Sequence, residues 1–294
     1  MSMNLWWQTL DFCSKKQTVT EFFKEQNFTW KILSQPCYLK VGDEFIVIPN
    51  HQVSVRSDNL KPIAVVKNRY KLLDNEECFK IADEFKKLYP QSYFSSCGDI
   101  LNYKESYLSM KLKDEIICFD IFEVWLTFSN GFDGRNAVNA TLTLIRKKDH
   151  CVFQLFNENI PRIWTLGRMN IIKKIEEIHK GIENYIIYAK NVCEKMKVDY
   201  IYLNETVKKI FDINLKKTNR INKNLAYVME SVREKYIKEG GKSAYDLYFA
   251  LSDYFCNSKR LRRDKLADDK RFQSAMIKYF YEVQNYAMKF LPYA

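Results

Sequence analysis

Residues 117–145, ICFDIFEVWLTFSNGFDGRNAVNATLTLI, are the clearest guide to the architecture, because a short polar segment separates two strongly apolar runs. In the second run, apolar residues alternate with Asn139, Thr141 and Thr143, which is typical of a strand with one dry and one polar face. The polar segment, residues 129–136, contains Asn-Gly and Asp-Gly, which accept positive φ and favour a tight reversal. It lacks the Gly-Lys-Ser/Thr element of a phosphate loop and the alternating acids of a calcium loop. The sequence therefore predicts a hairpin connection between antiparallel strands.

The chain upstream and just downstream of this stretch shows the same strand chemistry, interrupted by short helices. Capping patterns at Thr18 and Asp74 predict one helix that runs to about Gln26 and another that ends before Pro90. Turns are expected at Gly42-Asp43, Pro49-Asn50 and Asp58-Asn59. β-branched and aromatic residues predict strands over residues 30–40, 44–49, 53–57, 62–70, 107–112, 117–128, 137–145 and 151–156.

From about residue 158 the apolar period changes from two to between three and four. One long amphipathic helix is predicted from the spacing of Ile171, Ile175, Ile178, Ile182, Tyr185, Ala189, Val192 and Met196. Further helices are expected over residues 205–215, 219–238, 243–256 and 268–291. We therefore predict an α+β fold. An antiparallel or mixed sheet with a crossing helix fills residues 1–157, and a helical, basic domain of residues 158–294 packs on that sheet.

The composition predicts a globular protein with a real core. The chain has 294 residues, of which 47% are hydrophobic and 15% aromatic. No apolar run approaches the ~18 residues of a membrane helix. The first residues, MSMNLWWQTLDF, lack a basic n-region and a small-residue cleavage site. We expect no membrane association and a cytoplasmic location.

Residues suited to metal binding or catalysis are scattered. The eight cysteines include no C-x-x-C pair, and the three histidines, His51, His150 and His179, are not at ligand spacing. No nucleophile elbow is present. Asp120 and Glu123 lie in an apolar run, where a carboxylate must be paired, exposed or functional, and a partly exposed strand face is the favoured reading. The sequence predicts no catalytic residue, no metal and no cofactor, and we expect the protein not to be an enzyme.

The charge of the chain is strongly asymmetric. Residues 1–150 carry 20 Lys and Arg against 19 Asp and Glu, whereas residues 151–294 carry 27 against 17, so nearly all of the net +11 lies in the second half. A basic half beside a neutral one is suited to a polyanion, nucleic acid first and an anionic membrane second. Basic proteins without such a partner are also common, and this alternative stays open.

The densest basic segment, residues 257–271, holds seven Lys and Arg against three Asp. Arginine is well shaped for bidentate phosphate contacts. A second basic cluster lies at residues 208–223, and a third consists of Arg146, Lys147 and Lys148. Either the three clusters converge to form one basic groove, or their side chains are separate and solvated. The candidate nucleic-acid-binding residues are Lys259, Arg260, Arg262, Arg263, Lys265, Arg271, Arg146, Lys147 and Lys148.

Several stretches, taken together and in order, resemble a known family. They are Trp6-Trp7-Gln8, FTWKILSQPCYL (28–39), VRSDNLKPIAVVKNRYKLLDNEECFKIADEF (55–85), FSNGFDGRNAVNATLTLIRKKDHCVFQ (128–154), GKSAYDLYFALSDYF (241–255) and DKRFQSAMIK (269–278). They resemble the phage- and plasmid-borne family of the domain of unknown function 932. Two departures are visible. Gly131-Phe132 replace the centre of the family's N-S-H-D-G turn, and Cys151-Val-Phe-Gln154 matches its V-C-Q-N run only in part. The resemblance implies a mobile-element protein near replication and recombination genes, and it brings no established reaction.

These observations lead to one functional expectation with rivals. The first is a non-catalytic protein that binds nucleic acid, single-stranded DNA above all, in phage or plasmid recombination or replication, with a homo-oligomer as an option. The alternative is a phage-encoded protein-interaction factor that inhibits a host or defence protein in the host cytoplasm, with Trp6, Trp7 and Trp164 as hot-spot candidates. A third, an enzyme on nucleotides, requires a pocket in which Asp120, Glu123 and Arg135 converge.

Overall fold

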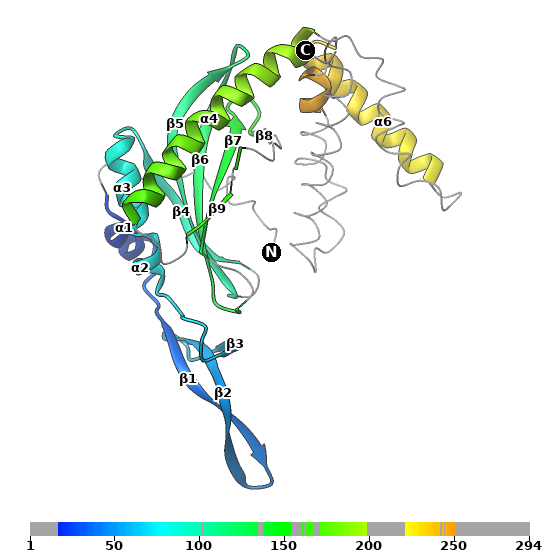
Figure 1. Ribbon diagram of the computed structural model, residues 1–294. Helices are drawn as coiled ribbons and strands as arrows, with labels where there is room; N and C mark the ends of the chain where they lie inside the picture. Colours follow the sequence, from blue (N-terminus) through cyan, green and yellow to red (C-terminus); the bar gives the residue numbers. More distant parts are fainter. Residues whose placement is uncertain are drawn as a thin grey trace. The chain divides into compact units, whose positions relative to one another are not determined.

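The computed structural model describes residues 17–100, 103–134, 138–153, 160–161, 163–166, 171–198, 221–241, 243 and 245–250 (Figure 1). The predicted α+β class is wrong, because the described residues are mostly β, with two antiparallel sheets of three and six strands and few helices. The helices expected over residues 205–215 and 268–291 lie outside the described residues.

The three-stranded sheet has the order β1-β2-β3, from β1 (Ile32–Val41), β2 (Glu44–Arg56) and β3 (Pro62–Lys67). A two-residue turn, Gly42-Asp43, joins β1 to β2, and Gly42 has a φ of 63°, which glycine adopts readily. The predicted turn at Pro49-Asn50 is wrong. Strand β2 runs through it as an irregularity in the pairing with β1, because Asn50 takes a φ of 61° without reversing the chain.

The six-stranded sheet has the order β4-β5-β6-β7-β8, and β9 pairs with β7. Strands β8 and β9 share β7: Leu144–Arg146 pairs with β8 and Asn139–Thr141 pairs with β9. The first three residues of the connection predicted for residues 129–136 belong to β6, which runs to Gly131, and β7 is the neighbour of β6 in the sheet. The strands are β4 (Tyr93–Ile100), β5 (Glu105–Ile117), β6 (Asp120–Gly131), β7 (Asn139–Arg146), β8 (Cys151–Phe153) and β9 (Ile163–Thr165).

Three local features made the sequence understate the β content. The run 117–128 is two strands, since a tight turn at Cys118-Phe119 separates β5 from β6. Both turn residues have positive φ, 55° and 72°, although neither is a glycine or asparagine. Strand β4 is rich in serine, and β9 has only three residues, so neither showed a clear period of two.

Three short helices precede β4: α1 (Val19–Glu25), α2 (Asn75–Phe79) and α3 (Ile81–Leu88). The predicted cap of α1 is confirmed, because Thr18 and Glu21 form a reciprocal capping box. The predicted second helix is broken at Lys80 into α2 and α3. Aromatic side chains attach these helices to the six-stranded sheet, as in the pairs Phe22 with Phe94 and Phe85 with Phe128.

The long helix predicted after residue 158 is confirmed as α4 (Ile171–Val198), drawn across the strands in Figure 1. Its predicted apolar face is buried at Ile178, Ile182, Tyr185, Ala189 and Val192. Gly181 brings the helix close to β9: a Cβ at this position would lie 2.5 Å from Cζ2 of Trp164. Helix α6 (Ile221–Lys238) and a helical segment at residues 245–250 follow.

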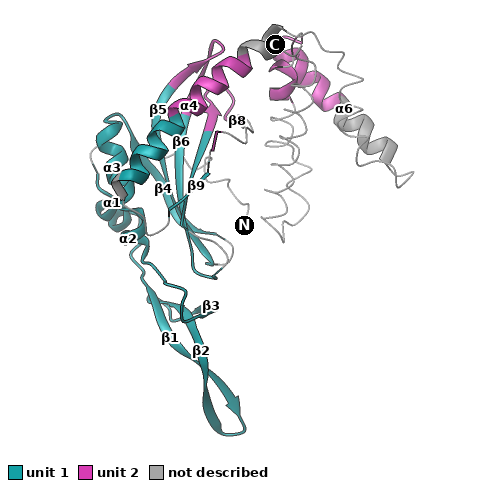
Figure 2. Ribbon diagram, viewed as in Figure 1, with its two compact units in different colours: residues 1–114, 124–143, 162–182 teal, residues 115–123, 144–161, 183–294 magenta. Residues whose placement is uncertain are grey.

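The chain divides into two compact units (Figure 2). The first consists of residues 1–114, 124–143 and 162–182, and the second of residues 115–123, 144–161 and 183–294. Each unit therefore combines segments from both sides of residue 157. The predicted division into domains 1–157 and 158–294 stays a prediction.

Candidate functional site

The distal half of the β1–β2 hairpin, residues 38–48, is the most exposed apolar part of the described chain, and we call it the arm. Cross-strand pairs place Tyr38 opposite Val47 and Leu39 opposite Ile46. Because side chains alternate along a strand, these two pairs lie on opposite faces of the ribbon. The arm is therefore apolar on both faces. Six of its large apolar side chains are at least half exposed: Tyr38, Leu39, Val41, Phe45, Ile46 and Val47.

The arm is joined to the proximal part of the hairpin around Arg56, which we call the root. Arg56, at the end of β2, is 6% exposed and lies between the rings of Trp30 and Tyr103, with Cζ 4.2 and 4.6 Å from their centroids. Its Nε and Nη2 donate to the two carboxylate oxygens of Asp58 at 3.0 and 2.7 Å, and Nη1 donates to Asp99 of β4 at 2.5 Å. A bidentate fork held between two rings fixes the direction of β2.

The ion pairs of Arg56 have the expected electrostatic effect on both partners. The hydrogen bond to Asp58 is the main cause that raises the pKa of Arg56 above its ordinary value, and burial opposes it. The hydrogen bond from Arg56 lowers the pKa of Asp58. Both groups therefore stay charged at neutral pH, and the root is held in one arrangement.

The connection predicted as a hairpin turn also supports this root. Phe132, inside the connection, is fully buried, and its ring lies 5.4 Å from that of Trp30. Ser54 of β2 donates to the carbonyl of Phe132 at 3.1 Å, and the Tyr70 hydroxyl donates to the carbonyl of Gly131 at 2.7 Å. Gly131 and Phe132 thus form a buried platform for the three-stranded sheet, which the polar sequence around them did not indicate.

The predicted basic triplet after residue 145 lies at the β7–β8 turn, where it meets acids. The Arg146 side chain is fully buried. Its Nη1 and Nη2 donate to the two oxygens of Glu239 at 2.8 and 2.9 Å, and its Nε donates to Asp149 at 3.0 Å. Asp120 lies 3.5 Å from Nη1, and the Phe249 ring centroid lies 3.5 Å from Cζ. The Arg146 guanidinium therefore faces the protein, not the solvent.

Lys148 and Tyr245 complete this ion cluster, which contains two cations and three carboxylates. Lys148 is about half exposed and contacts Glu239 at 3.1 Å and Asp120 at 3.5 Å. The Tyr245 hydroxyl donates to Asp120 at 2.5 Å. Burial and this hydrogen bond raise the pKa of Tyr245, so the phenol stays a neutral donor.

The pKa of Arg146 is set by opposing effects. Burial alone would lower it, but the hydrogen bonds and charges of Asp149 and Glu239 outweigh burial and raise the pKa. Arg146 therefore stays charged although it is buried. The folded chain depends on Asp149 and Glu239 to balance this buried charge. The arrangement is suited to holding the β7–β8 turn.

The carboxylates singled out from the sequence do not form a shared site. Asp120 belongs to the ion cluster, while Glu123 lies three residues further along β6 and so points to the opposite face of the strand. Glu123 is buried. Arg135, the third residue of the convergence that an enzyme would require, lies outside the described residues.

The other candidate positions are either buried or outside the described residues. The hot-spot candidate Trp164 is 2% exposed and packs in the core, whereas Trp6 and Trp7 lie outside the described residues. Six of the candidate nucleic-acid-binding residues also lie outside the described residues: Lys259, Arg260, Arg262, Arg263, Lys265 and Arg271. In the described part of the chain, no group of three His, Cys, Asp or Glu is placed to hold a metal, and no helix is long and apolar enough to cross a membrane.

Comparison with known proteins identifies no relative: no family model, no curated protein and no solved structure matches the chain. The resemblance to the family of the domain of unknown function 932 therefore stays a prediction. The arm, its root and the ion cluster are defined by the contacts and exposures of their own residues, without support from a relative. The arm could have been found from the sequence. The segments YLKV (38–41) and EFIVI (44–48) on either side of Gly42-Asp43 lack the alternation of apolar and polar residues that a hairpin with one buried face shows.

Proposed function

We propose that the chain is a non-catalytic nucleic-acid-binding protein of a phage or another mobile element. It binds single-stranded DNA during recombination or replication. The observation that carries this proposal is the charge asymmetry: residues 151–294 hold 27 Lys and Arg against 17 Asp and Glu, while residues 1–150 are almost neutral. A concentrated positive charge attracts a polyphosphate backbone and releases its counterions.

The phosphate contacts are assigned first to the segment 257–271, whose seven basic residues exceed its acids by four. Lys259, Arg260, Arg262, Arg263, Lys265 and Arg271 contact phosphates in this proposal. Lys147 and the half-exposed Lys148 assist them from the β7–β8 turn, although Lys148 also contacts Glu239 and Asp120. Arg146 has a different part, because its buried guanidinium positions the turn that carries these two lysines.

The test is the salt dependence of binding to a labelled single-stranded oligonucleotide, followed by fluorescence anisotropy. Affinity should fall steeply with salt, with a log-log slope of about 0.7 for each phosphate neutralised on a single strand. Replacing Lys259, Arg260, Arg262 and Arg263 together by glutamine should lower the affinity at least tenfold and make the slope shallower.

A matched control replaces four exposed lysines of the neutral half, Lys24, Lys80, Lys87 and Lys104, by glutamine. This variant loses the same charge, so an equal loss of affinity would reduce the proposal to a general effect of net charge. Binding that is absent, or that does not respond to salt, would remove the proposal.

A second candidate function is the protein-interaction factor, and the arm is the observation that favours it. Apolar side chains exposed on both faces of a ribbon suit a protein contact better than a phosphate contact. Capture of one stoichiometric host protein from a lysate, unchanged by nuclease, would support this candidate. Capture that disappears on nuclease treatment supports nucleic-acid binding.

A further inference from the structure

The arm combines two features that rarely occur together on a solvated hairpin. Its six large apolar side chains are 50% to 69% exposed, and both of its outer strand edges are unpaired among the described residues, because β3 pairs only with residues 51–55 of β2. Exposed, flat and apolar edge strands tend to associate, and proteins normally blunt them with charge or cover them.

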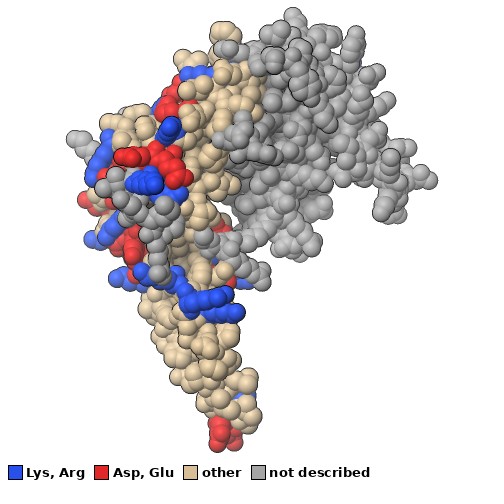
Figure 3. All heavy atoms as spheres, viewed as in Figure 1, with Lys and Arg blue, Asp and Glu red and all other residues tan. Residues whose placement is uncertain are grey.

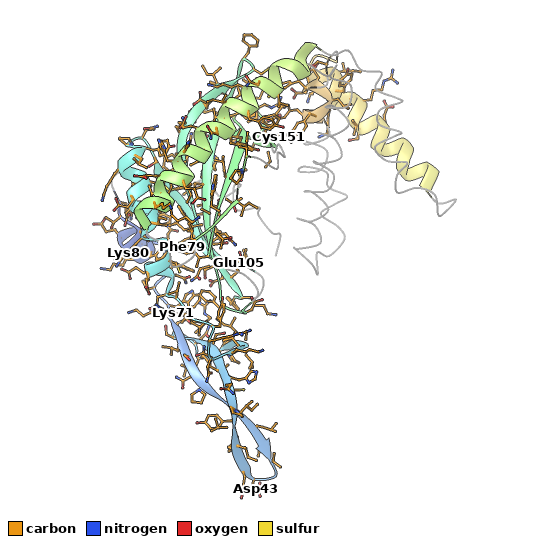
Figure 4. All side chains as sticks on the ribbon, in the orientation of Figure 1. Asp43, Lys71, Phe79, Lys80, Glu105 and Cys151 are labelled. Carbon is orange, nitrogen blue, oxygen red and sulfur yellow. The ribbon has the colours of Figure 1, made fainter. Side chains whose placement is uncertain are left out.

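The charges at the two ends of the arm have opposite signs. Asp43 lies at the tip and Lys71 at the root (Figure 4), and acidic and basic side chains gather at these two places (Figure 3). Glu44 follows Asp43 at the tip, and exposed Lys67 and Arg69 precede Lys71. The pairing of His51 with Lys67 places these cations where the apolar stretch ends. Among the described residues, none of these five side chains forms an ion pair. The hairpin thus has a net acidic tip, where exposed Lys40 lies beside the two acids, an apolar middle and a basic root.

This order of charges is self-complementary. In a two-fold pairing each contact occurs twice, with residue i of one copy on residue j of the other and the reverse. Two arms that run in opposite directions place each acidic tip beside the partner's basic root, and the apolar stretches then cover each other. Parallel arms would instead bring like charges together at both ends.

The apolar surface of the arm is smaller than one side of a standard protein interface. The exposed fractions of the six apolar side chains correspond to roughly 600 Å² for each copy, if a large side chain exposes about 200 Å² when free. A standard interface buries about 800 Å² on each partner, so the charged ends and the strand edges supply the remainder. One partner arm covers one face of the ribbon, which holds three of the six side chains, so a single pairing covers about half of this apolar area directly.

The root favours such a contact energetically. The Arg56 fork, the Trp30 and Tyr103 rings and the platform at Phe132 hold the proximal half of the hairpin. Less conformational entropy is then lost when the arm binds, since its direction is already fixed. We propose that the arm is a self-association element, through which two copies of this chain pair arm to arm in opposite directions.

The first experiment measures the mass of the full-length, nuclease-treated protein by sedimentation equilibrium. The wild-type chain should form dimers. The variant Phe45→Lys, Ile46→Lys places a charge on each apolar face and should weaken association at least tenfold. Leu88→Lys is the matched control, because Leu88 is exposed at the end of α3, away from the arm, and this variant should associate like the wild type.

The second experiment tests the opposite orientation by charge reversal. One variant carries Asp43→Lys and Glu44→Lys, so that both ends of its arm are basic. The other carries Lys67→Glu and Arg69→Glu, so that its tip is acidic and the charge at its root is reversed. Each variant alone should associate weakly because its tips repel the partner's roots. A mixture of the two should associate with each other, since every tip then meets a root of opposite charge.

Three results would overturn the proposal. In the first, the wild-type chain stays monomeric up to about 100 µM. In the second, the arm variants associate as strongly as the wild type does. In the third, a mixture of the two charge-reversed variants associates no more strongly than either variant alone. A monomeric chain that captures a host protein through the arm would assign the arm to a different partner. Because these measurements contain no nucleic acid, they fail or succeed independently of the proposed DNA binding.

Discussion

The six-stranded sheet and the arm are built from similar residues but differ in burial. In β6 and β7, Phe122, Val124, Leu142 and Leu144 are completely buried, whereas Phe45 of the arm is 69% exposed. Other side chains bury the first set, as the rings of Phe153 and Phe249 do for Phe122, while no described residues cover the arm. An apolar strand pattern therefore shows that a surface needs covering, but it does not show whether the same chain covers it.

The largest effect is expected at the ion cluster beside the six-stranded sheet. Arg146→Ala leaves the carboxylates of Asp149 and Glu239 partly buried without their cation, so the free energy of unfolding should fall by about 3–5 kcal/mol. Lys40→Ala in the arm is the control and should change it by less than about 0.5 kcal/mol. Urea unfolding measures both. Equal, small effects would mean that the cluster contributes as little as a surface ion pair.

The second prediction compares two phenylalanines. Phe122→Ala should cost about 3–4 kcal/mol, because it opens a cavity between the rings of Phe153 and Phe249. Phe45→Ala should cost less than about 0.5 kcal/mol in dilute protein. At high concentration the cost of Phe45→Ala should increase, because association through the arm stabilises the folded chain. A cost for Phe45→Ala that is large and independent of concentration would contradict the exposure of the arm.

The smallest effect is expected at the arm root and depends on pH. The hydrogen bond from Arg56 lowers the folded-state pKa of Asp58 below its ordinary value of 3.8. A lowered pKa stabilises the fold above the ordinary value, and this stabilisation is lost as the pH falls through the folded-state pKa. Asp58→Asn should therefore reduce stability at pH 7 by less than about 1 kcal/mol, since Asp58 is partly exposed.

Urea unfolding of this variant and the wild type at pH 7 and near pH 3 checks the sign. The difference between the two proteins should shrink at the lower pH, because the unfolded wild-type chain then takes up a proton at Asp58. A difference that stays constant would assign the effect of Asp58→Asn to packing and not to charge.

Part of the fold was readable because its signals are local. The capping box at Thr18, the turn at Gly42-Asp43 and the apolar face of α4 each depend on residues within a few turns of helix or one hairpin, and the structure contains all three. The turn at Cys118-Phe119 was not readable, because neither residue carries the usual preference for positive φ.

The candidate site divides in the same way. The charge asymmetry and the basic segment 257–271 are properties of composition, so sequence alone supplies them. The burial of Arg146 was not visible, because Glu239 lies 93 residues away in the chain and only folding brings the two together. The core position of Trp164 likewise follows from its contact with Gly181 of α4.

The capping box at Thr18, the turn at Gly42-Asp43, the apolar face of α4 and the place where positive charge accumulates could be predicted from the sequence, because they depend on neighbouring residues and on simple counts. The division of the strands into two sheets, the burial of the Arg146 and Arg56 guanidinium groups and the exposure of the arm became visible in the folded structure. Burial and pairing depend on contacts between residues far apart in the chain, and no local pattern encodes which distant partner is present.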